Sequence, residues 1–226
     1  MKKLVVLSGA GVSAESGIKT FRDAGGLWEG HDIMEVASPE GWAKNKALVL
    51  DFYNQRRRQA HTVKPNEAHY ALAKLEEKYE VTIVTQNVDN LHELAGSSHI
   101  IHLHGELFKS RSTANPSLVY DIKGTELNVG DKCELGSQLR PHIVWFGEEV
   151  PEIPKAVKIV QKADIFIVIG TSLNVYPAAG LIDYVPSSCE TYVIDPNMPY
   201  LSPRPHLTLI EKKATDGMKQ ILKLLM

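Results

Sequence analysis

Short apolar runs rich in β-branched residues occur along the chain and predict buried strands. They are LVVL at 4–7, VTIVT at 81–85, IFIVIG at 165–170 and TYVID at 191–195, with a weaker run, HLTLI, at 206–210. Because these runs are continuously apolar rather than alternating, they are typical of parallel strands covered on both faces of a sheet.

Stretches with helical spacing separate these runs. One follows Pro65 at 66–79, with Asn66 as the expected N-cap, and two more lie at 152–163 and 214–226. Strands that alternate with helices predict an α/β fold, a Rossmann-like parallel sheet with helices on both faces.

Two segments depart from this alternation and predict a smaller lobe formed by two insertions. Residues 25–60 lead from two glycines into a helix with no strand, and residues 109–139 are polar and rich in Gly, Ser, Asn and Lys. A cleft between two lobes is a natural ligand site. The expected organisation is a single domain over 1–226, with its core formed by 1–24, 61–108 and 140–226.

Composition and charge narrow the class of protein. The 226 residues are 43% hydrophobic and 23% charged, and the formal net charge is −2, so no strong basic field attracts nucleic acid or a membrane. The apolar stretch at the N-terminus is too short for a signal peptide. We expect a cytoplasmic protein with no nucleic-acid or membrane partner, in which Cys133 and Cys189 are free thiols.

A glycine pattern directly after the first apolar run indicates dinucleotide binding. Gly9, Gly11 and Ala14 form G-x-G-x-x-A, which lets backbone amides approach a pyrophosphate at the start of a helix. A purely structural glycine turn would give the same pattern. A dehydrogenase would place a ribose-binding acid at the end of its second strand, where this chain reads TQNVDN, so hydride transfer is disfavoured.

Polar residues follow the run at 81–85. Gln86, Asn87 and Asp89 are expected at the carboxyl end of a strand, where ligands bind in open α/β sheets. An amide and a carboxylate there match the donors and acceptors of a carboxamide such as nicotinamide. The alternative is a capping turn before the helix NLHEL.

The segment HIIHLHGELF at 99–108 carries three histidines. Strand alternation places His102 and His104 on one face, with Ile101 and Leu103 on the other. His104, beside a glycine, is the candidate general base because a histidine titrates near neutral pH. The alternative is a histidine with a structural role only.

Six motifs then resemble the sirtuin family, in the family's order: GAGVSAESGI, FRD, TQNVDNLH, HLHGEL, LRPHIVWFGE and GTSLNVYPA. The resemblance covers nearly the whole chain and implies NAD-dependent deacylation of lysine, releasing nicotinamide and O-acyl-ADP-ribose, with His104 as catalytic base. The residues it implies for NAD are Gly9, Ala10, Gly11, Glu15, Ile18, Phe21, Arg22, Gln86, Asn87, Asp89, Gly170, Thr171, Ser172, Asp195 and Ala214. Asp195 departs from the family's usual asparagine, but a carboxylate can also accept from ribose hydroxyls.

The resemblance also implies that an acyl-lysine peptide or protein binds as an added strand. The residues implied for this substrate are Val144, Phe146, Gly147, Glu148 and Val175. Two readings of the same cofactor site remain beside deacylation. One is mono-ADP-ribosyl transfer to a protein, and the other is a non-catalytic NAD-binding sensor, which would have no need of a base.

Three consecutive arginines lie on a helix expected over NKALVLDFYNQRRRQA. Helical spacing places Arg56 on the apolar stripe beside Tyr53, Arg57 at its edge and Arg58 in solvent. In sirtuins that prefer acidic acyl groups, a Tyr-x-x-Arg on this helix binds the acyl carboxylate, and Tyr53 and Arg56 match it. Ala37 is expected to leave room for the longer acyl chain. The alternative is that Arg56 packs its stem and extends to solvent.

The small lobe departs from the family at its zinc site. Most sirtuins carry two C-x-x-C pairs, and the matching positions here are Ser112, Asn115, Cys133 and Gly136. Serine, asparagine and glycine do not replace thiolates as zinc ligands, so we expect no structural zinc. Hydrogen bonds and packing must then hold this lobe together.

Overall fold

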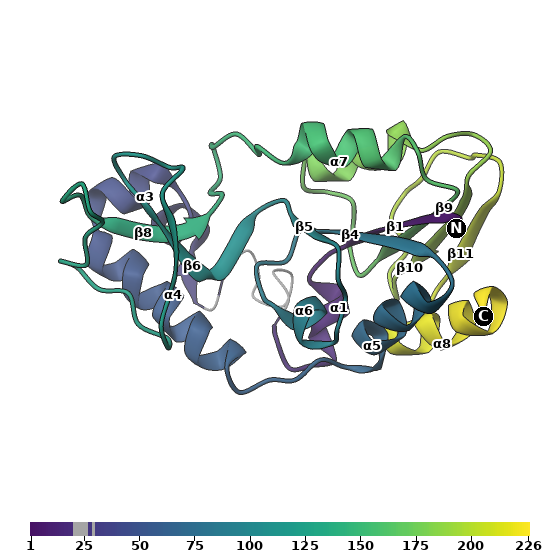
Figure 1. The fold of residues 1–226 in the computed structure, drawn as a ribbon, viewed down its shortest axis with the longest axis horizontal. Coiled ribbons are helices and arrows are strands. Elements are labelled where there is room, and N and C mark those ends of the chain that lie inside the picture. The colour runs from purple at the N-terminus through teal and green to yellow at the C-terminus, as the bar shows by residue number, and fades with distance from the viewer. Residues whose placement is uncertain (20–26, 29) are drawn as a thin grey trace.

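The computed structural model describes residues 1–19, 27–28 and 30–226, which form a larger and a smaller lobe (Figure 1). A six-stranded sheet in the order β11-β10-β9-β1-β4-β5 forms the larger lobe. All of its strand pairs are parallel, as the continuously apolar runs predict. Its strands are β1 (Lys3–Ser8), β4 (Glu80–Thr85), β5 (Ile100–His102), β9 (Ile165–Ile169), β10 (Glu190–Ile194) and β11 (Leu207–Ile210).

Helices cover both faces of this sheet, so the predicted Rossmann-like architecture is confirmed. On one face α5 (Glu67–Lys74), continued by the 3-10 turn η1 (Leu75–Glu77), packs beside α8 (Ala214–Leu225). On the other face lie α7 (Ile153–Val160) and the 3-10 helix η2 (Ala178–Tyr184). None of the described helices is long and apolar enough to cross a membrane.

The helix that begins after Asn66 shows how the sequence sets these boundaries. The Asn66 side chain accepts a hydrogen bond from the backbone N–H of Ala68, which confirms the predicted N-cap. An N-cap of this type stabilises a helix by about 1 kcal/mol because it satisfies a donor that the helix leaves unpaired. Leu72, on the inner face of α5, is fully buried against the sheet.

The strand order reverses at β1. The chain adds β4 and β5 on one side of β1, then crosses to add β9, β10 and β11 on the other side. At such a switch point the connections after neighbouring strands diverge and leave a crevice at their carboxyl ends. The short helices α1 (Gly11–Ala14) and α6 (Leu91–Leu94) lie after β1 and β4 at this edge.

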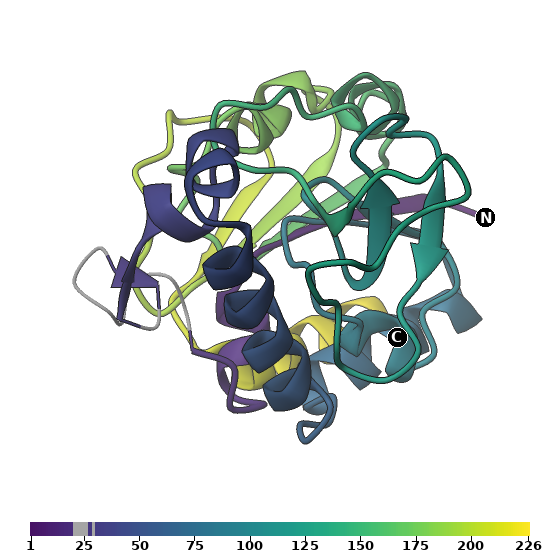
Figure 2. The same ribbon diagram turned by 90° about the vertical axis from the view of Figure 1, so that its left-hand side faces the viewer.

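The smaller lobe combines three helices with an antiparallel sheet in the order β7-β6-β8. Figure 2 shows α4 beside this sheet, and side chains of α4, β6 and β8 share one buried cluster. A short hairpin lies where no strand was expected; its strands, β2 (Leu27–Trp28) and β3 (His31–Asp32), have two residues each. The other elements are α2 (Ile33–Val36), α3 (Pro39–Lys44), α4 (Lys46–Ala60), β6 (Gly105–Ser112), β7 (Val119–Asp121) and β8 (Leu139–Ile143).

Two strands extend across the expected lobe boundaries. β6 begins four residues before 109, and β8 continues three residues past 140. Both strands extend because Leu107 on β6 and Ile143 on β8 are buried in the cluster with α4. Apolar contacts with the small lobe therefore draw these residues out of the expected core.

The three arginines of α4 differ in burial, and the prediction for Arg57 is wrong. Arg57 is fully buried, whereas Arg56 is half-buried and Arg58 is exposed. Arg57 donates from Nε to the carbonyl of Thr125 at 2.8 Å and from Nη1 to that of Leu107 at 3.1 Å. These acceptors come from segments distant in sequence, and helical spacing along α4 does not reveal them. For this reason the spacing predicted Arg57 at the edge of the apolar stripe rather than in the core.

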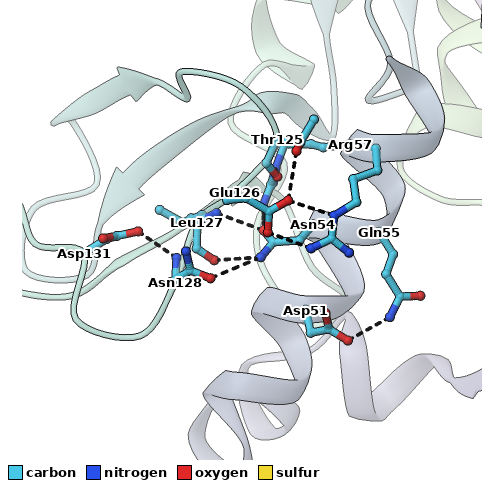
Figure 3. Close-up of polar contacts among 10 residues, drawn as sticks. Asp51, Asn54, Gln55, Arg57, Thr125, Glu126, Leu127, Asn128 and Asp131 are labelled. Carbon is cyan, nitrogen blue, oxygen red and sulfur yellow. Dashed lines mark hydrogen bonds and ion pairs between the residues drawn. The ribbon is translucent and has the colours of Figure 1, made fainter. Parts of the chain in front are cut away.

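Asn54 and Arg58 also contact the 125–131 segment. Asn54 accepts from the backbone N–H of Leu127 and donates to its carbonyl, which ties α4 to the 125–131 segment (Figure 3). Asn54 also accepts a hydrogen bond from Arg57. Arg58 lies in solvent, as predicted, and pairs with both carboxylate oxygens of Glu126 at 2.8 Å.

Candidate active site

The turn after β1 packs directly against the end of β9. The backbone N–H of Gly11 donates to the carbonyl of Gly170 at 2.8 Å, and a Cβ on Gly11 would lie 2.7 Å from the Gly170 Cα. Gly170 has φ +63°, and a Cβ there would clash with the backbone N of Val12. The glycines of the pattern therefore allow close backbone packing, which is the role expected of a purely structural glycine turn. The same packing brings the ends of β1 and β9 together at the switch point.

Gln86 connects the next strand to this junction. Its side-chain amide donates to the Oγ1 of Thr171 at 3.0 Å, and its backbone N–H donates to the carbonyl of Ser8. Gly9 lies in the same turn, where a Cβ would come within 2.7 Å of the Thr171 Cβ. Ser172 follows, half-buried. The structure therefore brings together the predicted residues that follow β1, β4 and β9.

Asn87 and Asp89 form a buried pair of acceptors in the same region. The Asn87 amide nitrogen donates to the carbonyl of Gly9 at 3.2 Å and to the Oγ of Ser13 at 3.1 Å, and its Oδ1 is the acceptor of the same amide group. Asp89 accepts from the Ser13 hydroxyl at 3.1 Å and from the backbone N–H of Leu91 at 3.1 Å. The second bond is the capping contact of the alternative interpretation, and burial raises the pKa of Asp89. Sequence reasoning did not single out Ser13, although it lies within the glycine motif.

His104 has the geometry of a neutral base. Its Nδ1 lies 3.0 Å from the carbonyl oxygen of Gln86, which only accepts, so Nδ1 carries the hydrogen and Nε2 is the basic nitrogen. Burial lowers the pKa of His104. Gly105 follows with φ +84°, and a Cβ there would clash with the carbonyl of His142, so the backbone beside the base requires glycine.

Some residues predicted for the cofactor are bound to other parts of the protein. Glu15 accepts from both the backbone N–H and the hydroxyl of Thr215 at 3.0 Å, next to the first residue of α8. Asp195 follows β10, as predicted, and accepts from the backbone N–H of Asn197 at 2.8 Å. Phe21 and Arg22 lie outside the described residues. Three predicted residues remain. Ala10 is the N-cap of α1, Ile18 is half-buried in the loop after α1, and Ala214 is the buried first residue of α8.

The segment predicted to bind the substrate lies along the smaller lobe. The backbone N–H of Val144 donates to the carbonyl of His104 at 2.9 Å, and that of Phe146 donates to the carbonyl of Ala37 at 3.0 Å. Phe146 is 42% exposed, and Val175, on the loop after β9, is 40% exposed. Apolar side chains on both the 144–147 segment and the loop after β9 thus remain accessible to a ligand.

Glu148, at the end of the same segment, is bound to the protein. Its two oxygens pair with Arg140 at 2.6 and 3.0 Å, and Oε2 lies 3.2 Å from Arg111. The backbone N–H of Trp145 also donates to Oε2 at 2.8 Å. Sequence reasoning missed these contacts, through which Glu148 holds the backbone of the 144–147 segment in place. Gly147, next to Glu148, is exposed.

Tyr53 on α4 contacts this segment, and Arg56 follows Tyr53 by three residues on the same helix. Tyr53 is fully buried, and its hydroxyl accepts a hydrogen bond from the Nε1 of Trp145 at 3.0 Å. Burial raises the pKa of Tyr53, so its phenol is neutral at physiological pH. The guanidinium of Arg56 lies 5.0 Å from the centroid of the Phe52 ring. The two members of the Tyr-x-x-Arg motif therefore share one side of α4.

A family model described as the Sir2 family matches residues 9–177. The chain belongs to the Sir2 family. A protein of Bacteroides thetaiotaomicron named an NAD-dependent protein deacylase is 56% identical over 230 residues, covering 100% of this chain and 98% of that protein. A Helicobacter pylori protein of the same name is 58% identical over 222 residues, covering 98% and 94%.

Solved sirtuin structures share the fold and arrangement of lobes. A crystal structure of a Sir2 homolog–NAD complex superposes with a TM-score of 0.89 at 40% identity, covering 99% of this chain and 89% of that one. A complex of Sir2 with an inhibitor, 2′-O-acetyl-ADP-ribose and a deacetylated p53 peptide gives 0.79 at 28% identity, covering 98% and 93%.

The zinc-site positions of this sirtuin hold a hydrogen-bonded cluster. The thiol of Cys133 lies 3.2 Å from the hydroxyl of Ser112 and 3.3 Å from that of Ser137, and the two hydroxyls lie 3.1 Å apart. Ser112 also accepts from the backbone N–H groups of Ala114 and Asn115. Both cysteines are free, and the described residues contain no group of three His, Cys, Asp or Glu side chains placed to hold a metal.

We expect the purified chain to contain no stoichiometric zinc, because only Cys133 supplies a sulfur at the four family positions. The triple variant Ser112→Cys, Asn115→Cys, Gly136→Cys restores four thiolates and is expected to bind about one zinc ion per chain. Elemental analysis and thermal melting with and without a chelator measure both results. A wild-type chain that holds zinc and melts at lower temperature with the chelator would contradict this expectation.

Proposed function

We propose that this NAD-dependent protein deacylase removes succinyl and malonyl groups, as well as acetyl, from lysine side chains. The observation that supports acidic acyl groups is the 3.0 Å bond between Trp145 and Tyr53, which puts Tyr53 next to the segment of Phe146. Arg56 lies one turn further along the same helix and supplies a positive charge. A neutral phenol and a guanidinium together match the acceptors of a carboxylate at the far end of an acyl chain.

On the cofactor side, the residues present fit NAD. The Oδ1 of Asn87 and the carboxylate of Asp89 are acceptors suited to the NH₂ group of the nicotinamide carboxamide. When bound, NAD supplies the ribose carbon from which nicotinamide departs and the hydroxyl group to which the acyl group is transferred. His104 accepts, at Nε2, the proton released during this transfer, because its hydrogen bond to Gln86 places the hydrogen of the neutral ring on Nδ1.

We further propose that the peptide substrate binds as an added strand between the 144–147 segment and the loop after β9. The exposed side chains of Phe146 and Val175 support this site, because they offer apolar contact from both sides. An added strand is recognised mainly through its backbone, so this mode reads little sequence beyond the acyl-lysine. Glu148 contributes by holding the segment in place through Arg140.

Arg56→Met is the test of acyl selectivity. Loss of the guanidinium is expected to lower kcat/KM for a succinyl-lysine peptide by about 10- to 100-fold, the value of a charge-assisted hydrogen bond. The rate on the same peptide with acetyl-lysine should stay within about twofold, because acetyl has no carboxylate. Steady-state rates on the two peptides with NAD measure this ratio.

Arg58→Met is the matched control, since Arg58 is on the same helix but exposed and paired with Glu126. It should change neither rate. Equal losses on both peptides with Arg56→Met would contradict the acidic-acyl proposal and indicate a structural arginine. Nicotinamide release by the wild type with neither acyl group removed would contradict deacylation and favour mono-ADP-ribosyl transfer.

A further inference from the structure

His102 and His104 hold neighbouring carbonyl groups of the loop that follows β4. The Nδ1 of His104 lies 3.0 Å from the oxygen of Gln86, and the Nδ1 of His102 lies 3.0 Å from the oxygen of Asn87. A carbonyl oxygen only accepts hydrogen bonds, so both Nδ1 atoms must carry a hydrogen. The two rings therefore bind the loop in the same way, but their second nitrogens differ.

The second nitrogen of His102 faces a carboxylate. Its Nε2 lies 2.6 Å from the Oε1 of Glu93 on α6, and the His102 side chain is only 9% exposed. An ionised carboxylate also only accepts, so Nε2 must donate as well. Both nitrogens of a histidine donate only in the imidazolium form, so this arrangement calls for a charged His102 beside a neutral His104. Burial alone would lower the pKa of His102, but the hydrogen bond and charge of Glu93 outweigh burial and raise it.

The bonds of His102 to Asn87 and Glu93 link the two ends of the segment 87–93, which carries the proposed acceptors for the nicotinamide carboxamide. Asn87, at the start of the segment, is held by its backbone oxygen, and Glu93, at the end, is held by its side chain. Asp89 lies between them. His102 holds the backbone of Asn87, and the bonds of the Asn87 amide to Gly9 and Ser13 orient its side chain from that backbone position. The charge of His102 also opposes the effect of burial, which raises the pKa of Asp89.

We infer that His102, paired with Glu93, is a positioning residue that holds the nicotinamide-binding loop in its NAD-binding geometry. The hydrogen bonds of the His102 ring go to Asn87 and Glu93, so it acts through the loop. The inference rests on the role proposed for Asn87 and Asp89 in binding NAD.

Other charged or titratable groups also surround this ring. Glu106 on β6 favours the charged ring and pairs with Lys109 at 3.0 Å. Asp89 in the loop and Glu93 on α6 are the two further carboxylates that interact with it. His92 on α6 is buried, and burial and its histidine neighbours lower its pKa, so it adds no competing charge. The negative groups around His102 therefore favour its imidazolium.

His102→Gln keeps a side chain of similar reach with one donor group but removes the charge and the second bond. The KM for NAD is expected to rise about tenfold, the value of one charge-assisted hydrogen bond, and inhibition by added nicotinamide should weaken by a similar factor. The KM for the acyl peptide at saturating NAD should stay within about twofold, since the hydrogen bonds of the His102 ring go to Asn87 and Glu93, outside the 144–147 segment. His99→Gln, an exposed histidine near the start of β5, is the matched control and should change neither value.

Glu93→Gln tests the charge itself. An amide no longer favours the imidazolium, so the pKa of His102 falls. The charged ring is the form that holds the loop, so kcat/KM for NAD should fall as the pH rises through the pKa of His102. In Glu93→Gln this fall should occur at a lower pH than in the wild type. The NMR titration of the His102 ring, assigned by its absence in His102→Gln, should show a pKa above the ordinary 6.5 in the wild type and a lower one in Glu93→Gln.

The outcomes separate this inference from the proposed function. Failure of the wild type to deacylate either peptide would count against the proposed function, while calorimetric NAD binding and the NMR titration would still test His102. Wild-type NAD affinity in His102→Gln, or a His102 ring that titrates below 6.5 in the wild type, would overturn the inference. If His102→Gln does not fold, Glu93→Gln carries the test, and an unchanged pH profile would overturn it.

Discussion

Replacing His104 with alanine is expected to lower kcat for deacylation by about 10²- to 10⁴-fold, the usual contribution of a general base. The affinity for NAD should stay within about threefold, because the loop after β4 keeps its contacts to Ser13 and His102. The base must be neutral to act, and burial lowers the pKa of His104. The acid limb of the kcat profile should therefore lie below the ordinary histidine pKa of 6.5, with activity lost as the pH falls through it.

Steady-state rates across pH 5 to 8 and calorimetric NAD binding measure these two effects. His99→Ala is the control, because the His99 side chain is exposed and its ring lies 2.8 Å from the hydroxyl of its neighbour Ser98, while the backbone carbonyl that accepts from Ile83 is kept in the variant. A His104→Ala variant that keeps most of its kcat while binding NAD normally would exclude His104 as the base.

The second large effect is on stability. Arg57→Met is expected to lower the free energy of unfolding by about 3–5 kcal/mol, since it leaves buried acceptors without donors. These acceptors are the carbonyls of Thr125 and Leu107, whereas the side-chain oxygen of Asn54 keeps the backbone N–H of Leu127 as a donor. Methionine fills much of the volume, so the loss comes mainly from hydrogen bonding.

Urea denaturation followed by circular dichroism measures this change. Arg58→Met removes an adjacent arginine whose ion pair is solvent-exposed, and it should cost less than about 1 kcal/mol. Equal midpoints for the two variants would show that the hydrogen bonds of Arg57 add little to the small lobe. Assays on Arg57→Met below its unfolding midpoint should retain acyl selectivity, which distinguishes it from Arg56→Met.

Much of the larger lobe could be predicted because local sequence decides it. Continuous β-branched runs define buried parallel strands, and Asn66 is a local cap, so the strand and helix positions agree with the structure within a few residues. The smaller lobe could not be predicted in the same way. Its sheet pairs β6 with β8 across an intervening polar segment, and side-chain alternation does not reveal such distant pairing.

The site shows the same division. Gln86, Asn87, Asp89 and His104 gather because the carboxyl ends of parallel strands share one edge of the sheet, which topology alone indicates. Glu148 was expected to contact substrate, but its oxygens are bound to two arginines. Such long-range ion pairs depend on how the lobe folds, and no local pattern encodes them.

The contact between Glu15 and Thr215 has a consequence for synthesis of the chain. The two residues are 200 positions apart, and α8 also covers the face of the sheet to which β1 belongs. During translation β1 and its turn emerge early, while the helix that completes their surroundings is made about 200 residues later. At about 5–20 residues per second, that delay lasts on the order of 10 to 40 seconds. For that interval the apolar side chains of β1 that face α8 in the folded protein lack this cover.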